Sequence, residues 1–144
     1  MNLNHGKYLG VDYGDKRTGL AECDLSGMLA SGIGTISEGG MRKTAERVAR
    51  EAESRLCKKI INGLPKNMDG SEGQRTEVIR AFAALVSEYT KIEIDFYDER
   101  MTTMMAYRYM GEVGTFGKKR KNNVDTLSAE IILQSYLDRE KSGR

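Results

Sequence analysis

The chain has very little of several residue types that proteins use for special purposes. Its 144 residues include no tryptophan, one proline, one histidine and two cysteines. Cys23 and Cys57 have no metal-ligand spacing, so we expect neither a zinc site nor a disulfide framework, and both thiols should stay reduced in the cytoplasm. No apolar run approaches the ~20 residues of a membrane-spanning helix. Residues 1–5 lack the basic and apolar regions of a signal peptide, so we expect a cytoplasmic protein without membrane contact.

The chain also has almost no excess of charge of either sign, since its formal net charge is only +2. That value does not by itself indicate a nucleic-acid-binding protein. The distribution is uneven, because residues 91–99 carry one cation and four anions, whereas residues 100–121 carry six cations and one anion. An acidic spot beside a basic segment is typical of a metal site that handles a polyanion. Taken alone, however, the charge is explained more simply by a solvated surface.

The hydrophobic pattern predicts an α/β fold. Short turns between the first three strands favour antiparallel pairing, and helical crossovers between the later strands favour parallel pairing. We therefore expect a mixed five-stranded sheet with helices on both faces, in one domain spanning residues 1–144. The expected strands are 7–13, 18–24, 28–36, 59–65 and 92–97, the last with one exposed or lightly covered face. The expected helices are 40–57, one that starts at a capping box formed by residues 71–74 and runs to Tyr89, a short one ending near Met110, and one from Val124 to Leu137; residues 111–123 form a Gly-rich, basic loop.

Carboxylates recur where these elements end. Asp12 closes the first strand and opens the segment Val-Asp-Tyr-Gly-Asp-Lys-Arg-Thr-Gly, while Asp98 and Glu99 close the fifth strand. Asp125 falls in the first turn of the final helix. Ligands of open α/β sheets bind beyond the carboxyl ends of parallel strands, so these side chains could gather at one rim. Carboxylates without histidine or cysteine partners suit Mg²⁺ or Mn²⁺, which can promote phosphodiester cleavage.

Each carboxylate also has a simpler interpretation. Asp12 could bond its own turn, although the apolar strand before it favours a site. Neighbours on a strand face opposite ways, and Asp98 shares a face with Ile94 and Phe96, so Glu99 is the favoured ligand and Asp98 stays open. On spacing alone, Asp125 is an ordinary acid at a helix N-terminus.

Cations adjoin the same positions. Lys16 and Arg17 follow Asp12, and Arg100 follows Glu99, so all three could bind phosphates. The basic run just before Asp125 could hold a nucleic-acid backbone, and a solvated loop is an equally good interpretation of it. Its members are Lys118, Lys119, Arg120 and Lys121.

The motifs taken together resemble the YqgF family, whose members are described as Holliday-junction resolvases and as pre-16S ribosomal RNA nucleases. The matching segments are Leu9–Gly14 with Lys16–Gly19, then Gly63-Leu64-Pro65, Asp69–Glu72, Asp98–Thr103 and Val124-Asp125. The resemblance implies a ribonuclease H-like fold and divalent-metal phosphodiester cleavage, with Asp12, Glu99 (or Asp98) and Asp125 as catalytic metal ligands. Two small departures, Thr18 and Ser128, touch none of these ligands.

The resemblance leaves two substrates open. The leading hypothesis is a nuclease that processes the 5′ end of pre-16S ribosomal RNA, with a ribosomal precursor particle as a further partner. The alternative is an endonuclease that resolves four-way DNA junctions, for which a symmetric homodimer rather than a monomer would be expected. No aromatic-rich surface for reading bases stands out, which favours recognition of substrate shape or of a ribosomal partner over sequence readout.

Two other classes of protein fit parts of the pattern. Asp12, Gly14 and Gly19 also match the phosphate-binding hairpin of actin-like ATPases and sugar kinases, but those proteins close two such domains around the nucleotide. A non-catalytic nucleic-acid-binding module is disfavoured, because a set of carboxylates repels phosphate unless a cation bridges them.

Overall fold

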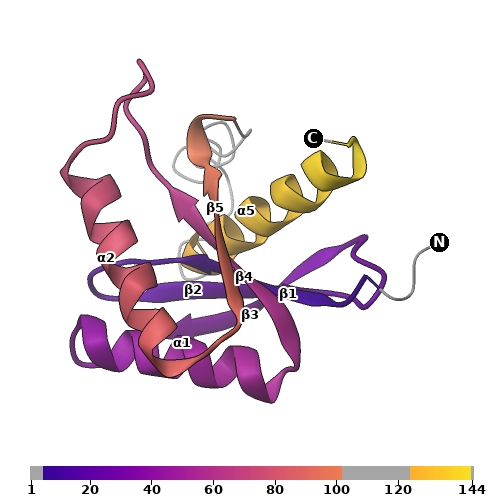
Figure 1. The fold of residues 1–144 in the computed structure, drawn as a ribbon, viewed down its shortest axis with the longest axis horizontal. Coiled ribbons are helices and arrows are strands. Elements are labelled where there is room, and N and C mark those ends of the chain that lie inside the picture. The colour runs from indigo at the N-terminus through magenta and orange to yellow at the C-terminus, as the bar shows by residue number, and fades with distance from the viewer. Residues whose placement is uncertain (1–4, 102–123, 144) are drawn as a thin grey trace.

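A mixed sheet of five strands forms the centre of the protein. The computed structural model describes residues 5–101 and 124–143, and its strands stand in the order β3-β2-β1-β4-β5 (Figure 1). β1, β2 and β3 pair antiparallel, whereas β4 is parallel to both β1 and β5. The predicted mixed sheet is confirmed. The elements are β1 (Lys7–Asp12), β2 (Thr18–Cys23), β3 (Ala30–Ile36), α1 (Met41–Ser54), β4 (Cys57–Leu64), α2 (Gln74–Tyr89), β5 (Glu93–Asp98), the short 3₁₀ helix η1 (Glu99–Met101) and α5 (Val124–Lys141).

Helices cover both faces of the sheet, as expected (Figure 1). α1 and α2 lie on one face, where Val48, Phe82 and Val86 are fully buried against the strands. α5 lies on the other face and buries Ile132, Leu133 and Leu137. Each strand therefore divides its side chains between two cores, in keeping with the alternation of side chains along a strand.

Glycines let α5 approach the sheet closely. A Cβ atom on Gly10 would lie 2.8 Å from the Cβ of Leu133, and one on Gly32 would lie 2.1 Å from Thr126 Cγ2. Both distances are shorter than real Cβ contacts allow. The helix consequently packs on backbone rather than on side chains at these two positions.

The junction between α1 and β4 differs from expectation. The helix was expected to reach Cys57, but it ends at Ser54, and Cys57 already belongs to β4. Leu56 makes the turn in the left-handed conformation, with φ of 59°. Its N–H donates to the carbonyl of Glu53 at 3.1 Å. Neither glycine nor proline marks this helix end, which is why the pattern did not reveal it.

The predicted capping box is wrong. α2 begins at Gln74, its N-cap is Gly73, and no side chain caps it. The hydroxyl of Ser71 instead donates to Asp69 Oδ1 at 2.6 Å and accepts from Asn67 Nδ2 at 2.9 Å. Ser71 therefore stabilises the loop before α2 and does not cap the helix.

The outer strands also differ in detail. Asp24 Oδ1 accepts hydrogen bonds from the N–H groups of Met28 and Leu29, at 2.9 and 3.3 Å, so these residues belong to the hairpin turn and not to β3. β5 runs from Glu93 to Asp98, and the expectation of an exposed or lightly covered face is confirmed. The Glu93 side chain is 67% exposed, Asp95 is half-buried, and on this face only Tyr97 is buried, at 5% exposed.

Two expected elements lie outside the described residues, namely the short helix ending near Met110 and the basic loop 111–123. None of the described helices combines the length and the apolar character needed to cross a membrane.

Candidate active site

Asp12 is the last residue of β1 and lies on the face of the sheet that α5 covers. Along this strand Leu9 and Val11 enter the core beneath α1 and α2, whereas Tyr8 belongs to the core beneath α5. Alternation therefore places Asp12 with Tyr8. The turn after it is closed by Thr18, whose Oγ1 accepts from the N–H of Gly14 at 3.4 Å.

Glu99 reaches the same place from the end of β5. Its Oε2 lies 2.8 Å from where a Cβ on Gly63 would be. Gly63 follows Asn62, the β4 residue that pairs with Val11, so it stands beside Asp12 in the sheet. Asp12 and Glu99 line one cavity of about 290 Å³. The other described residues that line this cavity are Tyr13, Pro65, Arg75 and Ile79.

Asp98 forms an ion pair with Arg100. Its carboxylate accepts hydrogen bonds from Arg100, at 2.7 Å from Nη2 and 3.0 Å from the backbone N–H. These bonds hold the pKa of Asp98 below its usual range. Arg100 also donates to the carbonyl of Met68 at 3.3 Å, and so joins the β4–α2 loop to the end of β5. Asp98 does not line the cavity that Glu99 and Asp12 share, so Glu99 is the acid of this pair that lies in the candidate site.

The backbone of Asp125 is placed by the direction of α5. Glu140 Oε2 accepts from the Tyr8 hydroxyl at 2.7 Å, and Leu133, two turns earlier, packs on Gly10. The helix therefore runs opposite to β1, and its first turn lies toward the carboxyl end of that strand. The side chain of Asp125 is outside the described part of the structure. Among the described side chains, no three His, Cys, Asp or Glu groups lie together as a metal site.

The predicted phosphate-binding cations that the structure describes do not line this cavity. Lys16 and Arg17 are exposed on the β1–β2 turn and do not line it. Arg100 lies nearby at the end of β5 but is bonded to Asp98. The basic run Lys118, Lys119, Arg120 and Lys121 lies outside the described residues.

Sequence reasoning missed Arg75, which among the described cations is the one that lines the cavity. It belongs to the first turn of α2, and its Nη2 donates to the carbonyl of Tyr13 at 2.9 Å. Its guanidinium carbon lies 5.6 Å from the centre of the Tyr13 ring, which stacks on Phe82. Burial and the nearby Asp15 raise the pKa of Tyr13. The sequence did contain a signal for Arg75. The helix that follows the Gly-Leu-Pro turn must begin near the same rim, so a cation in its first turn could have been considered.

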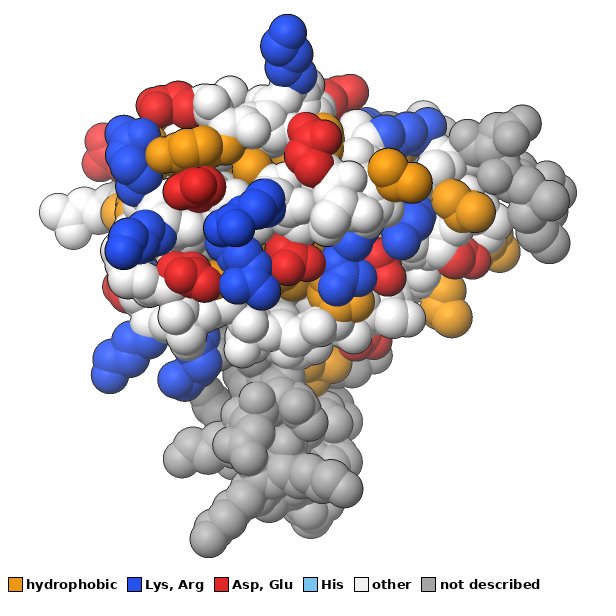
Figure 2. Space-filling model, turned by 90° about the horizontal axis from the view of Figure 1, so that it is seen from below, with side chains coloured by type: hydrophobic (Ala, Val, Ile, Leu, Met, Phe, Trp, Pro, Cys, Tyr) orange, Lys and Arg blue, Asp and Glu red, His pale blue; other side chains and the backbone are white. Residues whose placement is uncertain are grey.

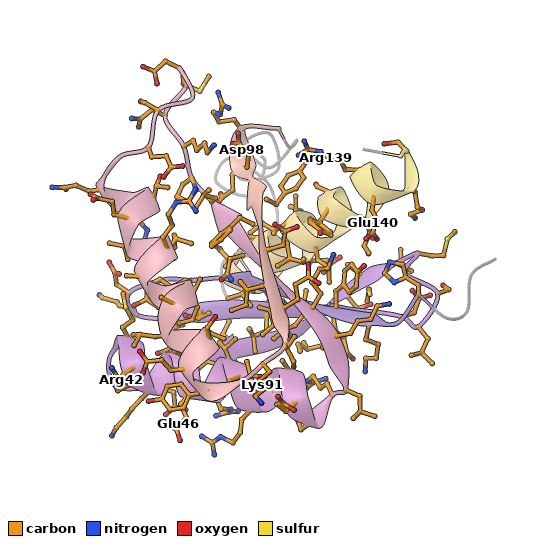
Figure 3. All side chains as sticks on the ribbon, in the orientation of Figure 1. Arg42, Glu46, Lys91, Asp98, Arg139 and Glu140 are labelled. Atoms are coloured by element: carbon orange, nitrogen blue, oxygen red, sulfur yellow. The ribbon has the colours of Figure 1, made fainter. Side chains whose placement is uncertain are left out.

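A second cavity, of about 350 Å³, lies between β5 and the C-terminal half of α5. This cavity is larger than the one with Asp12 and Glu99, but its carboxylates are already hydrogen-bonded to side chains that hold the fold together. Asp95 accepts from the Tyr136 hydroxyl at 2.7 Å, and Glu140 binds Tyr8 and His5, each at 2.7 Å. We therefore assign the candidate site to the smaller cavity. Figure 3 shows Glu140 and Arg139 on α5, with Arg139 next to the end of β5, where its guanidinium lies 5.9 Å from the centre of the Tyr97 ring.

The face formed by α1 is a poor candidate for binding a polyanion. Cations and anions alternate across it (Figure 2). Arg47 pairs with Glu38 and Glu51, and Arg55 pairs with Glu51 and Glu22. Because these two cations are already paired with neighbouring carboxylates, they add little to any attraction of this face for a polyanion.

The donor set at the rim fits a hard divalent cation. Asp12 and Glu99 supply carboxylate oxygens only, which suits Mg²⁺ or Mn²⁺. The missing side chain of Gly63 leaves the space that the carboxylate of Glu99 occupies. The described residues therefore satisfy two requirements of such a site, the ligand type and the room for it.

The fold class follows from comparison with solved structures. RuvC of Thermus thermophilus, solved in complex with a Holliday junction substrate, superimposes with a TM-score of 0.59 at 9% identity, over 96% of this chain and 97% of that one. The fowlpox virus resolvase, solved with Holliday junction DNA, gives a TM-score of 0.55 at 12% identity, over 93% of this chain and 98% of that one. The protein thus has the ribonuclease H-like fold that the resemblance implied.

Sequence comparison identifies the family. The family RuvX, described as Holliday junction resolvase, matches residues 6–139. A protein of Clostridioides difficile named "Putative pre-16S rRNA nuclease" is 41% identical over 133 residues, 92% of this chain and 94% of its own length. A protein of the same name from Ruminiclostridium cellulolyticum is 40% identical over 134 residues, 92% of this chain and 94% of its own. The chain belongs to the RuvX (YqgF) family of nucleases.

Proposed function

We propose that this protein is a divalent-metal-dependent nuclease that cleaves phosphodiester bonds in structured nucleic acid. The observation that carries the proposal is the meeting of Asp12 and Glu99 in one cavity at the ends of β1 and β5. Two carboxylates from distant parts of the chain would repel each other and a phosphate unless a cation joined them. Metal binding is the function that best explains their proximity.

Asp12, Glu99 and Asp125 would hold the cation, Mg²⁺ or Mn²⁺. When bound there, such an ion supplies positive charge against the developing charge of the phosphate and lowers the pKa of a water molecule. The chain supplies the positions. The end of β1 fixes Asp12, Gly63 leaves room for Glu99, and the first turn of α5 would bring Asp125 to the same rim.

We propose the 5′ end of pre-16S ribosomal RNA as the substrate, processed in the cytoplasm on a precursor particle or on free RNA. Two relatives that match 92% of this chain are named "Putative pre-16S rRNA nuclease". The basic run Lys118, Lys119, Arg120 and Lys121 would hold the backbone of the RNA, and Lys16, Arg17 and Arg100 would lie close enough to contribute.

A four-way DNA junction is the second candidate. It is favoured by the description of the family and by the fold shared with RuvC and the fowlpox virus resolvase. Symmetric cutting of a junction requires two active sites, so this substrate would require a homodimer, whereas RNA processing is compatible with a monomer. The family match argues against the actin-like ATPase.

The test is a cleavage assay with Mg²⁺ or Mn²⁺ on a pre-16S RNA transcript and on a synthetic four-way junction. Wild type is compared with Asp12→Asn, and with Asp138→Asn as a control in an exposed carboxylate of α5. We expect cleavage by wild type and the control, none by Asp12→Asn, and none with chelator. Cleavage that survives in Asp12→Asn or in chelator would overturn the proposed site. If neither substrate is cut, a non-catalytic binding module becomes the better interpretation.

A further inference from the structure

Arg75 and Asp15 form an ion pair at the mouth of the candidate site. Arg75 Nη1 lies 3.1 Å from Asp15 Oδ1. The two partners differ in their surroundings. Arg75 lines the cavity with Asp12 and Glu99, whereas Asp15 lies on the β1–β2 turn with 79% of its side chain exposed.

The guanidinium of Arg75 is held in place without help from Asp15. Its Nη2 donates to the carbonyl of Tyr13 at 2.9 Å, and it lies over the Tyr13 ring. That ring is itself fixed by stacking on Phe82, with 4.3 Å between the ring centres. The planar, permanently charged group is therefore positioned before any ligand arrives, which lowers the entropic cost of binding.

The bond to Asp15 is easily exchanged. Ion pairs between solvent-exposed side chains contribute little to stability, because water screens them and both side chains lose freedom. A phosphodiester oxygen offers the same charge and the same hydrogen-bonding geometry to a guanidinium as a carboxylate oxygen does. A phosphate that enters the cavity can therefore replace Asp15 with little loss.

The cavity needs such a cation. Asp12 and Glu99 bring negative charge to a place where the proposed substrate brings more. A bound metal ion would offset part of that charge, and a fixed guanidinium on the same wall would offset more. Lys16 and Arg17 do not line the cavity, so among the described cations Arg75 is the one placed for this role.

Resting on the proposed nuclease function, we propose that Arg75 forms a phosphate-binding subsite beside Asp12 and Glu99, and that Asp15 occupies its guanidinium until a backbone phosphate of the nucleic acid displaces it. The subsite takes one phosphodiester group of the substrate strand. The carbonyl of Tyr13 keeps Arg75 oriented in both states.

The first test is the salt dependence of binding, measured with a fluorescent four-way DNA junction and, in parallel, a pre-16S RNA transcript, in Ca²⁺ to limit cleavage. Loss of one phosphate contact in Arg75→Gln should lower the slope of log affinity against log salt by about 0.7–0.9. Arg42→Gln is the matched control, because Arg42 also forms an exposed ion pair, with Glu88 at 3.0 Å. That pair lies at the opposite end of α2 (Figure 3), roughly 20 Å from Arg75 at 1.5 Å per residue.

Arg75→Lys tests whether the charge of Arg75, and not only its packing, is needed for binding. Lysine keeps the charge but lacks the fork that binds the Tyr13 carbonyl and a phosphate together. It should restore the salt slope while leaving affinity below that of wild type. Thermal unfolding of each variant shows whether the fold is kept.

The second test is a double-mutant cycle with Asp15→Asn. Removing Asp15 should raise affinity about two- to fivefold when Arg75 is present, as expected for release of an exposed ion pair. In the Arg75→Gln background the gain should shrink, because only general repulsion is then relieved. Equal gains in the two backgrounds would overturn the exchange between Asp15 and phosphate.

The outcomes separate this proposal from the proposed function. If wild type cleaves and Arg75→Gln keeps the wild-type salt slope, the subsite is wrong and the nuclease stands. If wild type neither binds nor cleaves either nucleic acid, both are wrong.

Discussion

The carboxylate of Glu99 stands over Gly63, with its Oε2 2.8 Å from the point where a Cβ would be. Gly63 lies on the middle strand of the parallel part of the sheet, between β1 and β5. A carboxylate at the end of the edge strand can therefore reach across β4 toward Asp12. The glycine is what makes two residues 87 positions apart in the sequence share a cavity.

Replacing Gly63 with alanine should damage the site more than the fold. The added methyl group would meet Glu99 Oε2 at 2.8 Å and Ile132 Cδ1 at 2.5 Å. Overpacking of this kind costs about 1–3 kcal/mol of unfolding free energy. Displacement of the carboxylate should lower cleavage about tenfold to a hundredfold. Gly39→Ala, where a Cβ meets nothing within 4 Å, should change neither quantity measurably; equal effects at both glycines would contradict this explanation.

Exchanging each acid of the Asp98-Glu99 pair should separate their roles. Glu99→Gln removes a proposed metal ligand and should lower cleavage at least about a hundredfold, the scale of losing one transition-state-stabilising group. Asp98→Asn loosens the bond to Arg100 and should reduce cleavage much less. The test is to compare the steady-state cleavage rates of the two variants with wild type at saturating Mg²⁺. The assignment is reversed if Asp98→Asn is the inactive variant.

The Asp98–Arg100 pair should give stability that depends on pH. Hydrogen bonds from Arg100 lower the pKa of Asp98 in the folded protein, whereas in the unfolded chain the pKa returns to about 3.9. The stabilisation is therefore complete above the unfolded value and is lost as the pH falls through the folded value. Urea unfolding of wild type and Asp98→Asn should differ by about 1–2 kcal/mol above pH 5, and the difference should vanish in stronger acid. A difference that persists below both pKa values would mean that charge is not its cause.

Leu56 should be a site of easy stabilisation. Among the described residues it is the only non-glycine residue with positive φ, and 84% of it is exposed. The left-handed conformation costs a residue with a Cβ about 1–2 kcal/mol, and part of that is offset by the extra freedom glycine has when unfolded. Leu56→Gly should therefore raise the unfolding free energy by about 0.5–1 kcal/mol. Leu29→Gly, exposed but without positive φ, is the control and should not stabilise; equal gains would exclude backbone strain as the reason.

The parts of the fold that could be predicted are those set by local pattern. Alternation and helical spacing gave the strands and α1, α2 and α5, because burial on one face requires those periods. The antiparallel and parallel pairing of the strands followed from connection rules, and the rule for ligand sites in open α/β sheets put Asp12 and Glu99 at one rim.

The parts that could not be predicted depend on distant contacts. The left-handed turn at Leu56 has no local signal, since an exposed leucine stands where glycine is usual. Ser71 has the spacing of a cap, but its loop competes successfully for its hydroxyl. Arg75 enters the site only because the β1–β2 turn brings the carbonyl of Tyr13 to it. Asp125 required the family resemblance, because an acid at a helix start is commonplace.

The position of α5 in the chain has a consequence for synthesis. All five strands leave the ribosome before α5 does, yet this helix supplies half of the second core and covers Gly10 and Gly32. Until it emerges, the nascent sheet has one bare apolar face and cannot reach its native state. The proposed third carboxylate, Asp125, arrives with the same helix. Completion of the core and completion of the proposed metal site are therefore one late event, and a half-made chain would have no active nuclease centre.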